Sequence, residues 1–361
     1  MVFNQIVVFL SKKINTKMEK FILKQHIMKQ VSYFVSLIGI SLLFASCDGG
    51  GSFLSASSTA NEVLVVMAEN DWNDGMAGRA LFDVLNSPVA GLPQTEPNFR
   101  ILQVTPENFT STFKMTRNVV IPEISNIYSA PKLSSELDKY AYGQVVMTIK
   151  APDTLTFVNY VIQNKEKIID YLVNKELERT AEWLTKDASS PQAEIRKNFG
   201  ISMFYPKGLP TITTEQDFYW ATNNAGERRQ DIVIYQFPYT NENVFEKDSL
   251  IAIQNRVLGQ HIKGAHNSQM AISKMYDPFY KKMDVDGIFR AELRGLWEMT
   301  TDMMGGPFVS QAFVNPNTNK VIVATVFVYA PEGKKRNLIR NLEASFYTIK
   351  ILDPNTTAEK K

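Results

Sequence analysis

A nearly continuous apolar run, NEVLVVM over residues 61–67, is the first strong hydrophobic pattern after a Gly/Ser-rich stretch. Such a run is typical of a strand that is buried on both faces. Apolar residues at helical spacing predict a helix over 76–85, and a proline begins a predicted short helix over 106–114. The polar residues 70–74 predict a turn. Further strands are predicted over 99–104, 118–122 and 143–150.

The longest hydrophobic stripe covers residues 154–186, where apolar positions recur at helical spacing. At 1.5 Å per residue, a single helix of this length would extend about 50 Å. The stripe could be a partner-binding face. A core-facing stripe is favoured, because single helices normally bury that face within their own domain.

Beyond residue 190 the pattern predicts helices over 243–258 and 334–347. Residues 290–300, RAELRGLWEMT, alternate between charged and apolar positions. We interpret them as a strand with a charged, partly self-neutralising face that could line a polar groove. Glu292 and Glu298 would be about 20 Å apart at strand rise, too far for paired-carboxylate glycoside hydrolysis. Further strands are predicted over 200–205, 218–222, 231–238, 308–314 and 321–329.

These elements predict an α+β fold with two domains, each a sheet-plus-helix sandwich. Cleavage before Cys47 would leave 361 − 46 = 315 residues, more than single cores usually contain. We place the domain boundary near residue 190. The predicted parts are a signal over 1–46, a lipidated tether over 47–60, an N-terminal domain over 61–190, a C-terminal domain over 191–352 and a disordered tail over 353–361.

Residues 28–47, MKQVSYFVSLIGISLLFASC, have the architecture of an export signal that ends in a lipid-acceptor cysteine. Lys29 precedes an apolar run, and small residues stand directly before Cys47, the only cysteine of the chain. The run is short for a membrane span and has the small-residue exit of a processed signal. Met28 could be the true start, because signals usually have about 15–30 residues. The alternative is an extended basic leader from Met1.

We expect Cys47 to carry a diacylglycerol and to become the first residue of the mature protein. Its partner would then be the lipid bilayer, and the expected location is the cell envelope, on the outer membrane facing the periplasm. The Gly/Ser-rich residues 48–60 would act as a flexible tether. The alternative is an unacylated N-terminal tail of the same composition.

Charge and cysteine content exclude several classes of protein. The net charge is +2, but residues 1–46 contain six lysines and one acid, so the mature part has 33 basic and 36 acidic residues. A net charge of −3 gives no support to nucleic-acid binding, which needs a basic footprint. A single cysteine excludes intramolecular disulfides and a cysteine-rich metal site.

The usual sequence signatures of nucleophilic, nucleotide-binding and metal sites are missing from the chain. His261 and His266 are five residues apart, so they would not share a helix face as i, i+4 ligands do. Exposed or hydrogen-bonded histidines are favoured over a zinc pair. Met299, Met303 and Met304 are more typical of core filler than of soft-metal ligands. We therefore predict no metal and no cofactor.

The most unusual stretch is DMMGGPF over residues 302–308. Gly-Gly-Pro after a strand predicts a tight turn between paired strands, and glycine also lets a chain or ligand approach closely. A small binding or catalytic site, if the protein has one, is predicted around this turn. Its candidate residues are Trp297, Gly305 and Gly306 for ligand binding and Arg294, Glu298 and Asp302 for catalysis.

Asp153-Thr-Leu155 and Asp248-Ser-Leu250 each open a predicted helix. Aspartate is a preferred helix cap, because its carboxylate accepts hydrogen bonds from free backbone N–H groups. The same tripeptides are similar to the acceptor pattern of bacterial periplasmic O-glycosylation, at Thr154 and Ser249. The capping interpretation is favoured.

Several segments together resemble a family of Gram-negative lipoproteins described as a domain of unknown function. The resemblance covers residues 60–350, and its most specific parts are Arg294-Gly-Leu-Trp-Glu298 and Gly305-Gly-Pro-Phe-Val309. It implies an envelope location and no established activity, so it assigns no catalytic residue. More loosely, the order of elements over 200–350 is similar to the PsbP/Mog1-like plan, an antiparallel sheet with helices against it. The other matching segments are 61–67, 91–94, 117–118, 237–240 and 329–331.

The leading functional hypothesis is a non-catalytic binding or assembly module of the envelope, because helix stripes and sheet surfaces are present without a reactive motif. An envelope protein is a possible partner. The alternatives are a hydrolase-like enzyme and a carrier of a small apolar ligand, each with a site near residues 297–302. A concave pocket around Trp297, Glu298 and Asp302 would favour these alternatives.

Overall fold

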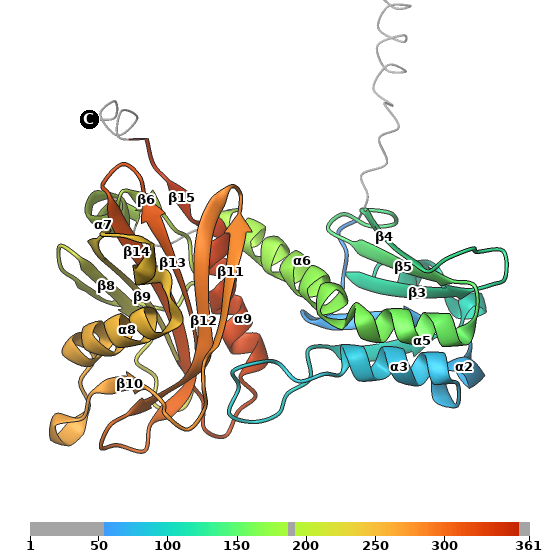
Figure 1. Ribbon diagram of the computed structural model, residues 1–361, viewed down its shortest axis with the longest axis horizontal. Coiled ribbons are helices and arrows are strands. Elements are labelled where there is room, and N and C mark those ends of the chain that lie inside the picture. Colours follow the sequence, from blue (N-terminus) through green and yellow to red (C-terminus); the bar gives the residue numbers. More distant parts are fainter. Residues whose placement is uncertain (1–53, 187–191, 354–361) are drawn as a thin grey trace, which may run out of the picture. The chain divides into compact units, whose positions relative to one another are not determined.

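The computed structural model describes residues 54–186 and 192–353, and its strands form two large sheets and a two-stranded one (Figure 1). Cys47, the signal, the beginning of the tether and the tail after Asp353 lie outside the described residues. Predictions about them therefore stay predictions. In the part of the chain that the structure describes, no helix is long and apolar enough to cross a membrane.

The first sheet contains β1 (Glu62–Val66), every residue of which is buried, as the apolar run predicted. β1 pairs in parallel with both neighbours, and only β4 runs antiparallel. Helices α2 (Glu69–Asn73) and α3 (Met76–Leu85) lie on one face of the sheet (Figure 1). The other face packs against Phe109 and Tyr140. The strand order is β2 (Arg100–Val104), β1, β3 (Asn118–Ile124), β5 (Val145–Ala151) and β4 (Lys132–Leu137).

Two local predictions in this part were wrong in detail. The polar residues 70–74 belong to helix α2 and not to a turn. Residues 106–114 form a short 3-10 helix, η1 (Pro106–Asn108), and a separate short α-helix, α4 (Ser111–Lys114), and not one helix. Strand β4 was not predicted, because its sequence KLSSEL is largely polar and its residues are partly or fully exposed.

The predicted helix over 154–186 is broken at Asn164 into α5 (Thr154–Gln163) and α6 (Lys165–Lys186). The Asn164 Nδ2 donates to the Tyr160 carbonyl at 2.8 Å, the kind of local hydrogen bond with which asparagine competes against helix continuation. The break lets α5 pack on α3 and lets α6 contact the 3-10 helix η4 (Ala344–Thr348), which packs on the second sheet. Most of the stripe faces the core, as favoured, but Leu155 and Ile162 on α5 are exposed.

The second sheet is antiparallel throughout and is covered on both faces. Helix α8 (Lys247–His261) packs on one face, together with η2 (Glu242–Phe245). On the opposite face lie α7 (Gln192–Phe199), α9 (Arg336–Glu343) and η4 (Ala344–Thr348). The strand order is β10 (Met270–Ile272), β12 (Ile288–Met299), β13 (Gly305–Asn315), β14 (Lys320–Tyr329), β9 (Arg229–Pro238), β8 (Phe218–Thr222) and β7 (Thr211–Thr214), and β11 (Phe279–Val285) also pairs with β12.

The α+β class is confirmed, and so are the central strands of the second sheet. Two elements are shorter than predicted. The strand predicted over 200–205 is only β6 (Ile201–Ser202), which pairs with β15 (Lys350–Ile351). The helix predicted over 334–347 is α-helical only to Glu343 and continues as the 3-10 helix η4. Residues from Leu54 onward form one compact unit, and the domain boundary near residue 190 stays a prediction. In this part of the chain the sequence did not predict α7, β7, β10, β11 or β15.

Candidate functional site

The charged side of β12 is buried. Arg290 and Glu292 are only 1% and 4% exposed, because α9 and η4 cover this face of the sheet. The alternation over residues 290–300 was predicted correctly, but the layer that covers its charged side was not. A buried charge is tolerated in a protein only when it is paired and hydrogen-bonded.

Arg294 on β12 lies between two buried carboxylates. Its Nη1 donates to Glu343 Oε2 at 3.3 Å, and its Nη2 donates to Glu343 Oε1, so the pair is bidentate. Nη2 also donates to Glu292 Oε1 at 3.3 Å. Burial by itself lowers the pKa of Arg294, but the attraction of Glu343 and Glu292 outweighs burial and raises it. The guanidinium therefore stays charged and is held in place.

Gln311 and Arg290 extend this arrangement along the sheet. Gln311 Nε2 donates to Glu292 Oε2 at 2.9 Å, and Gln311 Oε1 accepts from Arg290 Nη1 at 2.9 Å. Arg290 Nη1 also donates to the Phe346 carbonyl at 2.8 Å. Each of the four oxygens of Glu292 and Glu343 thus accepts a hydrogen bond from Arg294 or Gln311.

A second buried arginine, Arg340 on α9, holds the N-terminal part of the chain against the second sheet. Its Nη1 donates to Asn61 Oδ1 at 2.6 Å and to the Asn98 carbonyl at 2.8 Å, and its Nη2 donates to Asn98 Oδ1 at 2.6 Å. Burial lowers the pKa of Arg340 to about 10. The guanidinium also lies 5.7 Å from the ring centre of Phe99. These contacts fix the loop over 87–98 beside α9.

Glu96 completes this attachment at the start of α9. Its carboxylate accepts from the backbone N–H groups of Lys335 at 2.6 Å and Arg336 at 3.2 Å. A negative charge at a helix N-terminus is favoured by free N–H groups and by the helix dipole. The loop over 91–97 is therefore anchored at its end, and its first residues form part of a cavity wall.

A cavity of about 790 Å³ lies between α6, this loop and the β11–β12 hairpin. We call it the junction cavity. Its walls combine apolar and aromatic residues with the charged network around Arg294, and Lys281 Nζ lies 3.9 Å from Asp170 Oδ2 across two of its sides. This volume is within the range of ligand sites. Representative lining residues are Leu92, Ile169, Val173, Phe279, Arg294 and Leu296.

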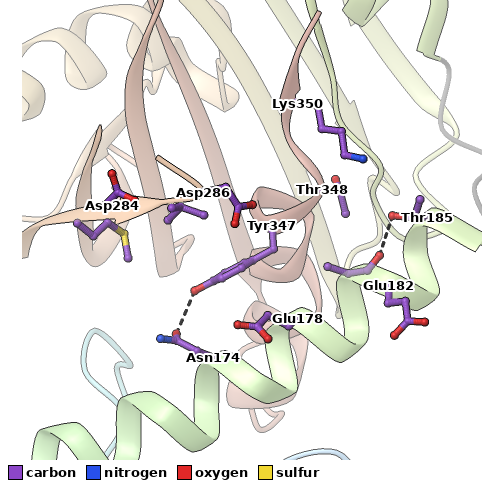
Figure 2. A pocket seen from close by; sticks show the side chains of 12 residues that line it. Asn174, Glu178, Glu182, Thr185, Asp284, Asp286, Tyr347, Thr348 and Lys350 are labelled. Atoms are coloured by element: carbon purple, nitrogen blue, oxygen red, sulfur yellow. Dashed lines mark hydrogen bonds between the residues drawn. The ribbon is translucent and has the colours of Figure 1, made fainter. Parts of the chain in front are cut away.

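A neighbouring cavity of about 440 Å³ shares Asn174, Met283 and Tyr347 with the junction cavity. Figure 2 shows Tyr347, whose hydroxyl donates to Asn174 Oδ1 at 3.0 Å, beside acidic side chains that come from α6 and from the β11–β12 hairpin. We call it the acidic cavity. Lys350 is its one lysine. Its carboxylates belong to Glu178, Glu182, Asp284 and Asp286. Glu178 and Glu182 also form exposed ion pairs with Lys175 and Lys186, each at 2.6 Å, whereas no ion pair holds Asp284 or Asp286 in the described residues.

Of the predicted catalytic residues, only Arg294 lines the junction cavity. Trp297 points to the opposite face of β12, where it is buried against Phe327 and donates from Nε1 to the Val328 carbonyl at 3.2 Å. Glu298 accepts a hydrogen bond from Ser273 Oγ at 2.6 Å, and Asp302 is exposed. The structure therefore does not gather Trp297, Glu298 and Asp302 around a cavity described here.

Gly305 and Gly306 form strand, and the prediction that they form a tight turn was wrong. The turn lies over residues 300–304, and the two glycines begin β13, where they pair with Glu298 and Trp297. A Cβ atom on Gly306 would lie 2.0 Å from the Val328 carbonyl oxygen. Close approach of neighbouring backbones, and not turn formation, explains why glycine stands there.

The histidines and methionines singled out in the sequence occupy separate places. His261 stacks on Phe218 with ring centres 3.9 Å apart, while His266 is exposed and has a positive φ. Met299 is buried in the core under α8, and Met303 is fully exposed. Met304 packs partly buried against the same core as Met299. Among residues 54–186 and 192–353, no group of three or more His, Cys, Asp or Glu side chains is placed to hold a metal ion.

The capping prediction is confirmed at one of the two aspartates. Asp153 caps α5, accepting from the Thr156 N–H at 2.8 Å and from its hydroxyl at 2.7 Å. Asp248 lies inside the first turn of α8, and residue 246 takes the cap position without a side-chain hydrogen bond. Glycosylation of Thr154 or Ser249 stays a prediction.

The β11–β12 hairpin, which forms one wall of the junction cavity, was missed in the sequence. The signal was present, because Asp286-Gly287 is a strong two-residue hairpin turn between strand-like runs. Both residues have positive φ, 55° and 77°, as this turn requires. The preceding FYKKMDV is too polar to stand out as a buried strand, and it is in fact largely exposed.

Two family models match successive parts of the chain. Residues 56–185 match a domain of unknown function, DUF8532, and residues 188–348 match a second domain of unknown function, DUF4837. These matches confirm the resemblance to a family of unknown function, while the similarity to the PsbP/Mog1-like plan is not confirmed. No curated protein matches the chain.

Proposed function

Because the two parts of the chain belong to families described as domains of unknown function, we propose its role from its own sequence and geometry. It is a non-catalytic binding module of the cell envelope, anchored by lipid at Cys47, that receives a partner in the junction cavity. The observation that carries this proposal is a cavity of about 790 Å³ whose charged wall is fixed in advance.

The state of the charged wall favours binding over catalysis. Arg294 pairs with both Glu292 and Glu343, and their carboxylate oxygens already accept hydrogen bonds from Arg294 or Gln311. A general acid or base has to present an available atom to its substrate. A rigid, internally satisfied wall instead supports recognition, because little ordering is needed when a partner binds.

The binding part of the proposal can be tested with two phenylalanines of one hairpin. Phe279 is 59% exposed and lines the junction cavity, while Phe289 is 43% exposed and packs edge-to-face on Phe245 under the other face. A photoreactive benzoylphenylalanine is placed at either position in the full chain in its native host. We expect light-dependent addition of a discrete mass at position 279 and none at position 289, measured by intact-mass spectrometry. Equal addition at both positions, or none at 279, would contradict the proposal.

The anchoring part predicts that Cys47 is the acyl acceptor. In cells given radiolabelled palmitate, the native chain should incorporate label and sediment with membranes, because two or more acyl chains give stable anchoring. The Cys47→Ala chain should do neither. Label in the Cys47→Ala chain, or its continued sedimentation with membranes, would contradict the proposal without affecting the cavity experiment.

A further inference from the structure

Strand β11 has one hydrogen-bonded edge. In residues 54–186 and 192–353 it pairs with β12 alone, over the register from Phe279–Arg294 to Val285–Ile288. A strand of this kind presents unpaired N–H and C=O groups that can pair with another chain. Residues of β11 line both the junction cavity and the acidic cavity, so the strand runs beside the groove that the two cavities form.

The direction of the backbone groups follows from hydrogen bonds at the far end of β12. The Leu296 carbonyl accepts from Ser273, and the Thr300 N–H donates to Gln269, both on the side of β10. In an antiparallel strand, the N–H and C=O of one residue point to the same side, and successive residues alternate. Even-numbered residues of β12 therefore direct their backbone groups toward β10 and β11.

The register carries this alternation over to β11. Even-numbered residues of β12 are opposite odd-numbered residues of β11, from 279 to 285, so the odd-numbered residues of β11 form the hydrogen bonds between the two strands. Tyr280, Lys282 and Asp284 consequently direct their N–H and C=O groups to the free edge. Three such residues offer up to six backbone hydrogen bonds to an added strand.

The side chains of β11 project to the two faces of the sheet and not across this edge. Tyr280 donates from its hydroxyl to the Phe245 carbonyl at 2.7 Å, and Lys282 Nζ lies 3.1 Å from Glu246 Oε1, both on the side of α8. Phe279, Lys281 and Met283 project to the other side and line the junction cavity. An added strand would therefore place alternate side chains in the same cavity.

The two ends of the groove differ in charge. Near Phe279 apolar and aromatic side chains line the groove beside the paired charges around Arg294, whereas carboxylates from α6 and from the hairpin line the acidic cavity (Figure 2). Phe279 and Asp284 are five positions apart, which is about 17 Å along a strand. The groove is thus complementary to a segment with an apolar residue at one end and a cation at the other.

We propose that β11 accepts an extended polypeptide segment as an additional strand, with an apolar side chain in the junction cavity and a Lys or Arg side chain in the acidic cavity. Alternate residues of a strand face one side, so these two side chains are separated by an even number of positions. The inference rests on the proposed function and names the chemistry of its partner. Backbone hydrogen bonds supply affinity in this mode, and the pockets supply specificity.

The first test uses a fluorescent decapeptide that alternates threonine with leucine, valine, leucine, lysine and lysine, and the lipidated full chain in detergent. Lys282→Pro removes one outward N–H while the hydrogen bonds to β12 remain, so the fold tolerates it. Lys282→Ala is the matched control. We expect the decapeptide to bind the native and Lys282→Ala chains within about twofold of each other and the Lys282→Pro chain at least about tenfold more weakly. Equal binding to all three, or no binding at millimolar peptide, overturns the inference.

The second test separates backbone pairing from side-chain contact. N-methylation of one alternate set of peptide amides should abolish binding, while methylation of the other set should leave it within a few-fold. Equal effects of both sets overturn strand addition. A non-peptide mass added at position 279 in the photo-crosslinking experiment would also overturn this inference, yet it would support the proposed function.

The third test concerns charge. Replacing the two lysines of the decapeptide with glutamates should weaken binding to the native chain about tenfold at low salt. In the double variant Glu178→Gln/Asp286→Asn, the lysine peptide should bind less than about threefold more tightly than the glutamate peptide, because two carboxylates of the acidic cavity are neutralised. Asparagine tolerates the positive φ of residue 286. An undiminished preference in the double variant overturns the assignment of the acidic end.

Discussion

Replacing Arg294 with methionine is expected to lower the free energy of unfolding by about 3–5 kcal/mol, because it leaves two buried carboxylates without their cation. Glu292 and Glu343 are nearly inaccessible, with side chains 6% and 4% exposed. Little water therefore reaches these two carboxylates. The measurement is urea unfolding of the Arg294→Met chain followed by tryptophan fluorescence.

Two further variants show whether charge or packing causes this loss. Lys282→Met breaks an ion pair with Glu246 in which both side chains are at least half exposed, and it should leave stability nearly unchanged because water solvates both groups. The triple variant Arg294→Met/Glu292→Met/Glu343→Leu removes all three charges and should recover much of the lost stability. A triple variant as unstable as Arg294→Met would show that the loss comes from packing.

Replacing Gly306 with alanine is expected to destabilise the chain by at least about 3 kcal/mol, at or beyond the upper end of usual overpacking costs. The added Cβ would lie 2.0 Å from the Val328 carbonyl oxygen and 3.3 Å from Trp297 Nε1. The Val328 oxygen also accepts the hydrogen bond of that indole. The change should therefore separate β13 from β14 and shift the fluorescence of Trp297.

The control for this prediction is Gly226→Ala. Nothing lies within 4 Å of a Cβ atom on Gly226, and its backbone has no positive φ. This variant should unfold at the same urea concentration as the native chain or slightly above it, since alanine reduces the entropy of the unfolded chain. A Gly306→Ala chain that unfolds together with the Gly226→Ala chain would contradict the close approach of β13 and β14.

Local sequence patterns predicted the elements whose burial is set by their own residues. The run over 61–67 specified a doubly buried strand, and the alternating and apolar runs over 290–329 specified β12, β13 and β14. They missed edge elements such as β4 and β11, because exposed strands have no strong hydrophobic signal. The Asp286-Gly287 turn was the one local sign of β11.

The candidate site could not be predicted in the same way. The alternation over 290–300 showed that Arg290, Glu292 and Arg294 share a face, but it did not show whether water or protein covers that face. The covering layer is α9, and the charge that completes the network is Glu343, 49 positions from Arg294. The unusual Gly-Gly-Pro stretch is a packing feature of the sheet and does not line this cavity.

The sequence by itself thus determined which residues form the strands and which side of each strand is apolar, because these follow from the two-residue repeat and the hydrophobic effect. Only the tertiary structure decided that a charged strand face is buried and that a cavity lies beside it. Arg340 and Asn61 are 279 positions apart, and nothing in the sequence near either residue specifies this contact. Burial of a charge depends on partners that only the folded chain brings within hydrogen-bonding distance.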